Sequence, residues 1–394
     1  SFIEPGLQDL AVSRTNFTWG IPVKKNEEHV IYVWIDALSN YITALDYGKK
    51  GDDFQKYWPA DIHLVGKEII RFHAIYWPMI LMALDLPLPK QIFAHGWLLM
   101  DKDKMSKSKG NVIYPDFLIE EYGMDSVRYY LMREVSFGAD GQFTPETFVN
   151  RFNNDLVNDL GNLVNRTIAM INKYYNGNVK SEKILYDEKK NLNDIINKTI
   201  ENHHSKFETL EFSKVLENIW NLISNSNKFI DLTKPWTLDP KDDKEMLSSI
   251  LFELSSAIKV IAFLVEPFIP NTSVNIYKNF NLTNNLSFEN LLNFEEKVSV
   301  LKNPIILFER LNKEEEIEKI KNKMISTPPK KEETISFDYF MKSKIVVGEI
   351  IESKKIEDSK NLLVSTIDIG SRKINVVSGI ATFYDPIEII GRKV

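Results

Sequence analysis

The sequence predicts a multidomain protein in which an α/β domain is followed by an all-α helical bundle and then by a small β-rich domain. Its 394 residues suffice for two to four domains of about 100–200 residues each. Short β-rich runs alternate with helical stretches between Val30 and Met100, and apolar residues recur at three- and four-residue spacing from Thr144 onward. Strand patterns return after Ile335. These three successive patterns of predicted secondary structure therefore indicate three folds along one chain.

The composition excludes several classes of protein. Hydrophobic residues make up 43% and charged residues 26% of the chain, as in ordinary globular proteins, and we expect no apolar run near the roughly 18 residues of a membrane span. The chain has no cysteine, which excludes a disulfide framework and thiolate metal ligands, and no secretory signal opens it. We therefore expect a cytoplasmic protein. With a net charge of -6, binding to a polyanion would depend on local basic patches.

The α/β domain is expected at residues 1–113. The runs "VIYVWI", "DIHLVG" and "QIFAHGWLLM" read as strands, and "EIIRFHAIYWPMILMAL" between them reads as a helix that "LDLPLPK" ends. This alternation is typical of βα units on a parallel sheet. The last strand leads directly into a lysine-rich loop, and ligands of open α/β sheets bind at the carboxyl ends of strands.

A helical bundle is expected at residues 146–310, after a connecting region at residues 114–145. The string "LTKPW" should break two long helices, because proline disfavours a helix at the residue before it. Residues 311–334 carry balanced charges and then two prolines, which predicts an exposed helix that fades into a linker. Residues 335–394 contain "KIVVGEII", "LLVSTIDIG", "RKINVVSGI" and "IEIIGRKV", which predict a small Greek-key barrel without its last part.

The loop "DKDKMSKSKGNV" carries the most specific motif of the chain. A lysine run by itself is usually a solvated face. Here, however, "KMSKS" at residues 104–108 continues into "KGN", follows a predicted strand and precedes a predicted helix, and it resembles the signature of class I aminoacyl-tRNA synthetases. Ammonium groups that reach a departing pyrophosphate in the transition state lower the barrier, and a flexible loop can close and reopen. The resemblance implies catalytic roles for Lys104, Ser106, Lys107 and Ser108.

The family is indicated by other segments. The stretches "YVWIDALSNYI", "HLVGKEIIRFHAIYWP" and "AHGWLLM" resemble the methionyl-tRNA synthetase family, in its bacterial form with a C-terminal tRNA-binding domain, and the resemblance covers the whole chain. It implies the C-terminal half of a Rossmann-type catalytic domain, an anticodon-binding bundle and a partial OB-fold. It also implies that methionine is activated with ATP and Mg²⁺ to methionyl-adenylate and is then transferred to the 3′ end of methionine tRNA, for initiation and elongation.

The resemblance implies three sets of binding residues. The methionine pocket matches Trp34, Ala37, Leu38, Tyr41, Phe72, His73 and Trp77, although Leu38 stands where some members have proline. Aromatic rings suit a polarisable thioether. The ATP contacts match Gly66, Glu68, His95, Leu98 and Lys107, with Glu68 where aspartate is common. The anticodon contacts match Asn162, Arg166 and Trp236, of which the first two share one helix face and the third would stack on a splayed base.

Simpler interpretations stay open for several of these residues. The aromatic pocket residues could be core and His73 a structural histidine, while Asn162 could cap a helix and Trp236 could pack under the proline turn. In the terminal domain, which resembles OB-folds that bind tRNA and join subunits into a homodimer, phosphate contacts or a merely solvated edge would explain Lys342, Lys344, Lys354 and Lys355.

The chain is expected to be a fragment. It starts with Ser1, and "IEIIGRKV" stops within a strand-like pattern. None of its six histidines stands in the His-x-Gly-His motif that class I synthetases use at the ATP phosphates. We therefore expect that this chain alone does not form the adenylate, that it holds no metal, and that zinc is conceivable only in a missing N-terminal part. Two alternatives remain, namely another class I synthetase and a non-catalytic tRNA-binding protein derived from one.

Overall fold

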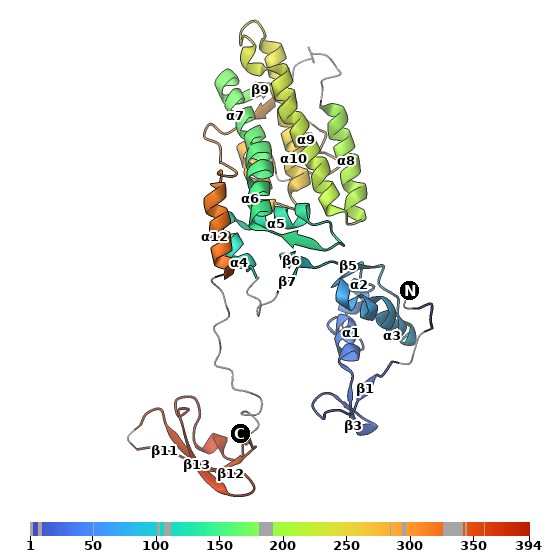
Figure 1. Cartoon of the computed structure of the whole chain (residues 1–394), viewed down its shortest axis with the longest axis vertical. Coiled ribbons are helices and arrows are strands. Elements are labelled where there is room, and N and C mark those ends of the chain that lie inside the picture. The colour runs from blue at the N-terminus through green and yellow to red at the C-terminus, as the bar shows by residue number, and fades with distance from the viewer. Residues whose placement is uncertain are drawn as a thin grey trace. The chain divides into compact units, whose positions relative to one another are not determined.

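The computed structural model describes residues 3–6, 10–49, 51–100, 103–105, 112–180, 192–283, 285–293, 297–325, 342, 345–357 and 359–394 (Figure 1). The chain divides into two compact units, Ser1–Pro328 and Pro329–Val394, and each is described by itself.

A small parallel sheet organises the first hundred residues. Strands β4 (Ile62–Gly66) and β5 (Gln91–His95) pair in parallel, so that both carboxyl ends lie at the same edge. The helical connection between them consists of η1 (Lys67–Ile69), the π-helix η2 (Phe72–Tyr76) and α3 (Trp77–Ala83). The elements before them are β1 (Ser13–Arg14), β2 (Pro22–Val23), β3 (Asn26–Ile31), α1 (Val33–Thr43) and α2 (Asp53–Tyr57). The buried core of this region is formed by Leu38, Ile42, Trp58, Trp77 and Leu81.

Two of the predicted strands are divided differently in the structure. The run "VIYVWI" is strand only as far as Ile31, and helix α1 begins at Val33 because its apolar positions Leu38 and Ile42 then reach the core together. The run "QIFAHGWLLM" is two strands, β5 and β6 (Leu98–Met100), in different sheets. At Gly96, between them, an added Cβ would lie 2.1 Å from the carbonyl oxygen of Ala139, so the crossing chain forces the break.

The sheet of β6 leads into the bundle. Strand β6 pairs antiparallel with β7 (Asp103–Lys104) and parallel with β8 (Gly141–Phe143). The helices are α4 (Pro115–Tyr122), α5 (Met124–Glu134), α6 (Pro145–Arg151), π-helix η4 (Phe152–Gly161), α7 (Asn162–Tyr175), α8 (Asn193–Glu208), α9 (Phe212–Thr233), η6 (Pro235–Thr237), α10 (Lys244–Val265) and α11 (Pro270–Asn279). A short sheet joins β9 (Asn178–Lys180) to β10 (Lys297–Ser299). Helices α7, α8, α9 and α10 run side by side, as Figure 1 shows.

Helix α10 is the centre of the bundle. Contrary to the expectation from composition, it is long and apolar enough to cross a membrane, with a mean hydropathy of 1.8. However, 89% of its apolar window is buried inside the bundle, as in the core helix of a globular fold. The predicted break at "LTKPW" is present, because Lys234 adopts a left-handed φ of 45° and Pro235 starts η6.

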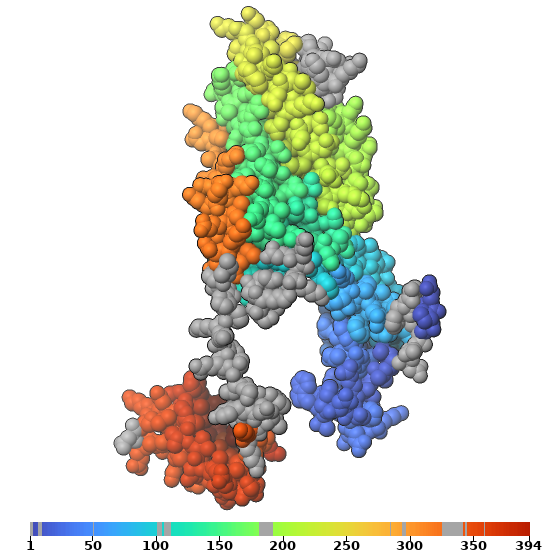
Figure 2. Space-filling view, in the orientation of Figure 1, coloured from blue at the N-terminus to red at the C-terminus, as the bar shows by residue number. Residues whose placement is uncertain are grey.

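Helix α12 (Lys313–Ile325) is packed, whereas balanced charges predicted an exposed helix. Ile320 is fully buried in the bundle core, and Ile317 packs against the same core. The hydroxyl of Tyr122 donates to Glu316 at 2.6 Å. Figure 2 shows α12 in orange against the side of the bundle. The apolar stripe of α12 explains the difference, and one core runs from Met100 to Ile320 across the expected boundaries after residues 113, 145 and 310.

The second unit is a three-stranded antiparallel sheet in the order β11 (Glu349–Lys355), β12 (Leu363–Asp368), β13 (Lys373–Ser378). Its small core is formed by Ile350, Leu363 and Ile389. The predicted strand "IEIIGRKV" is instead η7 (Ile387–Ile389) followed by a single bridge between Lys393 and Glu349.

Candidate active site and nucleic-acid interface

Helix α1 and the π-helix η2 bring four predicted pocket residues into one aromatic wall. Trp34 stacks on Phe72 with ring centroids 3.8 Å apart and planes 9° apart. The Tyr41 hydroxyl lies 2.9 Å from Nε2 of His73, and the rings of Trp34 and His73 meet edge to face at 6.3 Å. The predicted Ala37 lies on the same helix and is exposed.

Hydrogen bonds assign the tautomers of two histidines at this wall. His73 Nδ1 lies 3.0 Å from the carbonyl oxygen of Ile69, which can only accept, so Nδ1 carries the proton. In the neutral ring Nε2 is then the acceptor, and Tyr41 donates to it. Nε2 of His63 accepts from the indole of Trp77 at 3.1 Å, and burial together with the charge of His73 lowers the pKa of His63. The wall therefore presents aromatic rings and a hydrogen-bonded hydroxyl, a surface that suits a polarisable thioether.

Two predicted pocket residues lie beneath the wall. Leu38 exposes 1% and Trp77 0% of its surface, so both pack as core under the rings. Burial also raises the pKa of the Tyr41 hydroxyl. Leu38 and Trp77 can shape the wall, but they present no surface to a ligand in this conformation.

The predicted nucleotide contacts gather at the carboxyl edge of the parallel sheet. Gly66 ends β4 directly opposite His95, which ends β5, and Leu98 opens β6 three residues later. A Cβ on Gly66 would lie 2.8 Å from Oε2 of Glu68, so glycine leaves room for that carboxylate. Glu68 Oε2 accepts the indole N–H of Trp97 at 3.0 Å. Carboxylate and backbone groups thus line the edge where an α/β sheet binds its ligand.

A set of contacts between Lys67, Trp97 and Asp140 at this edge was not predicted from the sequence. Asp140 accepts from Lys67 Nζ at 2.6 Å and from the backbone N–H of Trp97 at 2.9 Å. Lys67 Nζ also lies 4.0 Å from the centroid of the Trp97 ring. Asp140 follows Trp97 by 43 residues, so no local pattern announces the contact. The only local signal for this contact was that Lys67 and Trp97 stand within "GKE" and "HGW", next to residues that were predicted to bind ATP.

The catalytic residues proposed for the lysine loop fall largely outside the described part of the chain. Lys104 ends β7, and only its backbone is described. Ser106, Lys107 and Ser108 lie outside the described residues. Met105, within the same motif, packs against the core of the bundle. The roles of the loop side chains stay predictions.

The predicted anticodon residues share one face of the bundle. Arg166 on α7 donates from Nη2 to Oδ1 of Asp231 at 3.0 Å, and its guanidinium carbon lies 5.8 Å from the centroid of the Trp236 ring. Trp236 is 50% exposed, and Asn162 is exposed one turn before Arg166. An exposed indole beside a guanidinium is suited to stacking on an unpaired base.

In the second unit, the predicted phosphate contacts are only partly described. Lys354 and Lys355 are exposed on β11, and Lys342 is exposed before it. Lys344 lies outside the described residues. Over the described ranges, no group of three or more histidine or carboxylate side chains could hold a metal ion.

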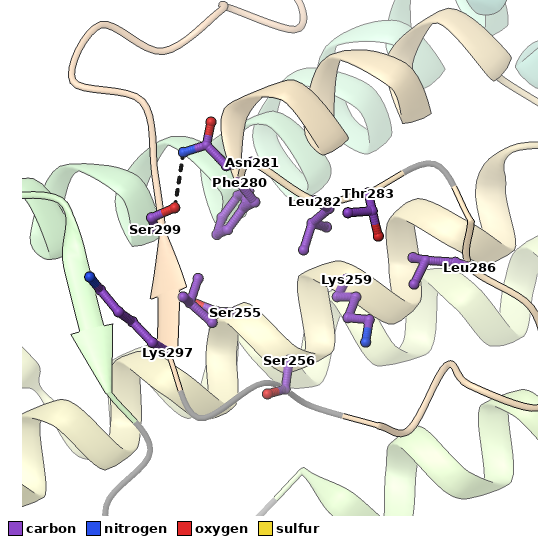
Figure 3. Close-up of a pocket in the computed structure, with 11 residues that line it drawn as sticks. Ser255, Ser256, Lys259, Phe280, Asn281, Leu282, Thr283, Leu286, Lys297 and Ser299 are labelled. Atoms are coloured by element: carbon purple, nitrogen blue, oxygen red, sulfur yellow. Dashed lines mark hydrogen bonds between the residues drawn. The ribbon is translucent and has the colours of Figure 1, made fainter.

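A separate pocket lies in the bundle and holds none of the predicted site residues (Figure 3). It is lined by Ser255, Ser256, Lys259, Phe280, Asn281, Leu282, Thr283, Leu286, Lys297, Val298 and Ser299. Ser255 and Ser256 donate to carbonyls of their own helix, and Lys259 donates to the carbonyl of Asn293 at 2.8 Å. These three side chains are already engaged within the fold, and we assign the pocket no role.

Three family models match the chain in succession. They are described as tRNA synthetases class I (M) for residues 1–168, anticodon binding domain of methionyl tRNA ligase for residues 180–327, and putative tRNA binding domain for residues 345–394. The chain belongs to the class I methionyl-tRNA synthetase family.

Individual methionyl-tRNA synthetases are similar over the whole chain. The methionine–tRNA ligase of Bacillus subtilis is 49% identical over 413 residues, covering 100% of this chain and 62% of the relative. That of Enterococcus faecalis is 47% identical over 421 residues, covering 100% and 63%. The Mycobacterium tuberculosis methionyl-tRNA synthetase, solved in complex with methionyl-adenylate, gives a TM-score of 0.73 at 36% identity and covers 78% of this chain and 62% of that one. The chain therefore spans about three-fifths of the length of these relatives.

Proposed function

We propose that this chain functions in a cytoplasmic methionine–tRNA ligase. In this reaction the methionine carboxylate attacks the α-phosphate of Mg–ATP, which releases pyrophosphate, and the methionyl group then passes to the 3′ end of methionine tRNA. The observation that carries the proposal is the aromatic wall, in which Trp34 stacks on Phe72 and Tyr41 donates to His73. Such a wall favours an unbranched thioether, because sulfur interacts favourably with rings and a charged side chain would lose its hydration.

The sheet edge is the proposed nucleotide site. Glu68 is held by the Trp97 indole beside Gly66, where its carboxylate can accept from the ribose hydroxyls. His95 and the backbone of Leu98 lie at the same edge and are assigned to the base and ribose. Lys104 and Lys107 of the lysine loop are assigned to the departing pyrophosphate, with Ser106 and Ser108 beside them.

The bundle is the proposed reader of the anticodon. Asn162 and Arg166 would hydrogen-bond base edges, and Trp236 would stack on one base. The second unit would add sequence-independent phosphate contacts through exposed lysines such as Lys354 and Lys355, and it could also join two copies of the chain.

The reader can be tested on this chain directly. Binding to methionine tRNA is compared with binding to the same tRNA carrying a changed anticodon, at two salt concentrations. We expect tighter binding to the methionine anticodon, and we expect Trp236→Ala to remove most of the difference, because base stacking contributes about 1–3 kcal/mol. Trp19→Ala is the matched control, since Trp19 is 87% exposed and lies outside the bundle.

Binding that ignores the anticodon at both salt concentrations would refute the proposed reader. A loss of discrimination in Trp19→Ala as large as in Trp236→Ala would refute the stacking role of Trp236. Methionine-dependent pyrophosphate exchange by the complete gene product separates a ligase from the alternative, a tRNA-binding protein without catalysis.

A further inference from the structure

The proposed anticodon face carries two cations, Arg166 and the exposed Lys234 next to Pro235 and Trp236. Arg166 is paired with Asp231 at 3.0 Å, so its charge is largely offset, and the whole chain carries a net charge of -6. Affinity for RNA depends mainly on cations that neutralise phosphates. A further cation beside Asn162 and Arg166 would therefore strengthen the binding of a tRNA loop.

A stripe of exposed side chains extends the face along the helix. Asn154, Asn158 and Asn162 follow each other at four-residue spacing on η4 and α7, and all three are exposed. Residues four apart lie on one side of a helix, so the stripe continues the line of Arg166. The distance from Asn158 to Arg166 along the axis is roughly 12 Å at about 1.5 Å per residue, which is short enough for one RNA loop to span.

Arg310 supplies a cation at the middle of this stripe. Its Nη1 donates to Oδ1 of Asn158 at 2.9 Å, and the side chain is exposed. Within the described ranges it forms no ion pair with a carboxylate, its neighbour Glu309 included. A guanidinium carries five N–H donors in a rigid fork that fits a phosphate, so one bond to an amide oxygen leaves donors for a ligand.

The backbone that carries Arg310 is held in place. The N–H of Leu311 donates to Oδ1 of Asn153, and Nδ2 of Asn153 donates to the carbonyl of Leu311, both at 3.0 Å. Asn153 exposes only 7% of its surface, and the ring of Phe308 meets that of Phe152 edge to face at 5.7 Å. Binding through Arg310 would therefore order one side chain and no backbone, which lowers its entropic cost.

We infer that Arg310 binds a tRNA phosphate beside the anticodon, next to the stripe formed by Asn154, Asn158 and Asn162. The inference rests on the proposed function of the bundle as a tRNA reader. Phosphate contacts position a nucleic acid and carry no sequence information. Arg310 therefore strengthens binding to every tRNA equally, while Arg166 and Trp236 distinguish the anticodon.

The test compares Arg310→Gln with the unchanged chain for methionine tRNA and for the anticodon-changed tRNA. One phosphate contact to a single strand contributes about 0.7 to the slope of log K against log salt. The ratio of the tRNA affinity of the unchanged chain to that of Arg310→Gln should therefore fall about 2.5-fold between about 50 mM and about 200 mM salt. The ratio of affinities for the two tRNAs should not change, and Arg310→Lys should keep most of the salt slope.

Asn158→Ala is the structural control. It removes the hydrogen-bond partner of Arg310 but keeps the charge, so the salt slope should remain that of the unchanged chain. An unaltered slope in Arg310→Gln, or a slope equally reduced in Asn158→Ala, would overturn the inference. If the unchanged chain binds both tRNAs alike, the proposed reader fails and the inference fails with it. If it discriminates and only the slope effect is absent, the inference alone fails.

Discussion

The hydroxyl of Tyr41 lies 2.9 Å from Nε2 of His73, across 32 residues of sequence. Because His73 Nδ1 donates to the carbonyl of Ile69, this contact has a direction, in which the tyrosine hydroxyl donates and Nε2 accepts. The hydroxyl proton is thereby used in a hydrogen bond within the wall. This bond connects helix α1, which carries Tyr41, to the π-helix η2, which carries His73.

Replacing Tyr41 by phenylalanine should destabilise the region around the wall. His73 exposes 3% of its surface, so its Nε2 would be left as a buried acceptor without a donor, which costs about 1–3 kcal/mol. Urea unfolding followed by tryptophan fluorescence measures the loss. Tyr47→Phe is the control, because the structure shows that ring against Phe54 and no hydrogen bond from its hydroxyl. Equal losses in both variants would contradict the assigned bond.

Gly96→Ala should disturb the junction of the two sheets. An added Cβ would lie 2.1 Å from the carbonyl oxygen of Ala139, and backbone cannot yield as a side chain end does. We expect a loss of about 1–3 kcal/mol in the free energy of unfolding, as for other overpacked sites. Gly51→Ala is a matched control, since the nearest atom there is Asp46 Cβ at 3.7 Å. A Gly96→Ala protein as stable as Gly51→Ala would show that the chains do not cross so closely.

The ion pair between Lys67 and Asp140 should contribute modestly to stability. The two side chains are 37% and 36% exposed, so water screens the pair, and we expect a coupling of about 0.5–1 kcal/mol. A double-mutant cycle with Lys67→Met and Asp140→Asn measures this term separately from the Trp97 N–H bond. Additive effects of the two substitutions would mean that the side chains do not interact in solution.

Stability should depend on pH through Glu253. Burial raises its pKa to about 7 from an ordinary value of 4.5, although the N–H of Leu192 donates to it. The folded state therefore holds the proton more tightly than the unfolded state. This contribution is fully present below about pH 4.5 and is lost as the pH rises to about 7, by an amount on the order of 3 kcal/mol.

Glu253→Gln should remove this dependence and leave the bundle more stable than the unchanged chain at about pH 8. The measurement is urea unfolding followed by circular dichroism of the helices at about pH 5 and about pH 8. Asp159, whose pKa burial raises to about 6, titrates in both proteins, so the difference between them isolates Glu253. A difference that is the same at both pH values would refute the assignment.

Features carried by short stretches of chain could be predicted from the sequence. The break at "LTKPW" follows from Pro235, and the helices at 193–208, 212–233 and 244–265 follow from their apolar spacing. The lysine motif and the segments around Trp34 and His73 identified the family, as the family matches show. Their periodicity and composition are local properties, so no knowledge of distant contacts was needed.

Other features depend on residues that meet only in the folded chain. The split of "QIFAHGWLLM" requires Ala139 against Gly96, and the packing of α12 requires the core around Ile320. The side chain of Arg310 meets that of Asn158 across 152 residues. Sequence by itself determined that the middle of the chain is helical and which family the chain belongs to. Only the tertiary structure decided which charges are paired, which rings are buried and which tautomers are held, because burial and long-range hydrogen bonds arise between segments that no local pattern connects.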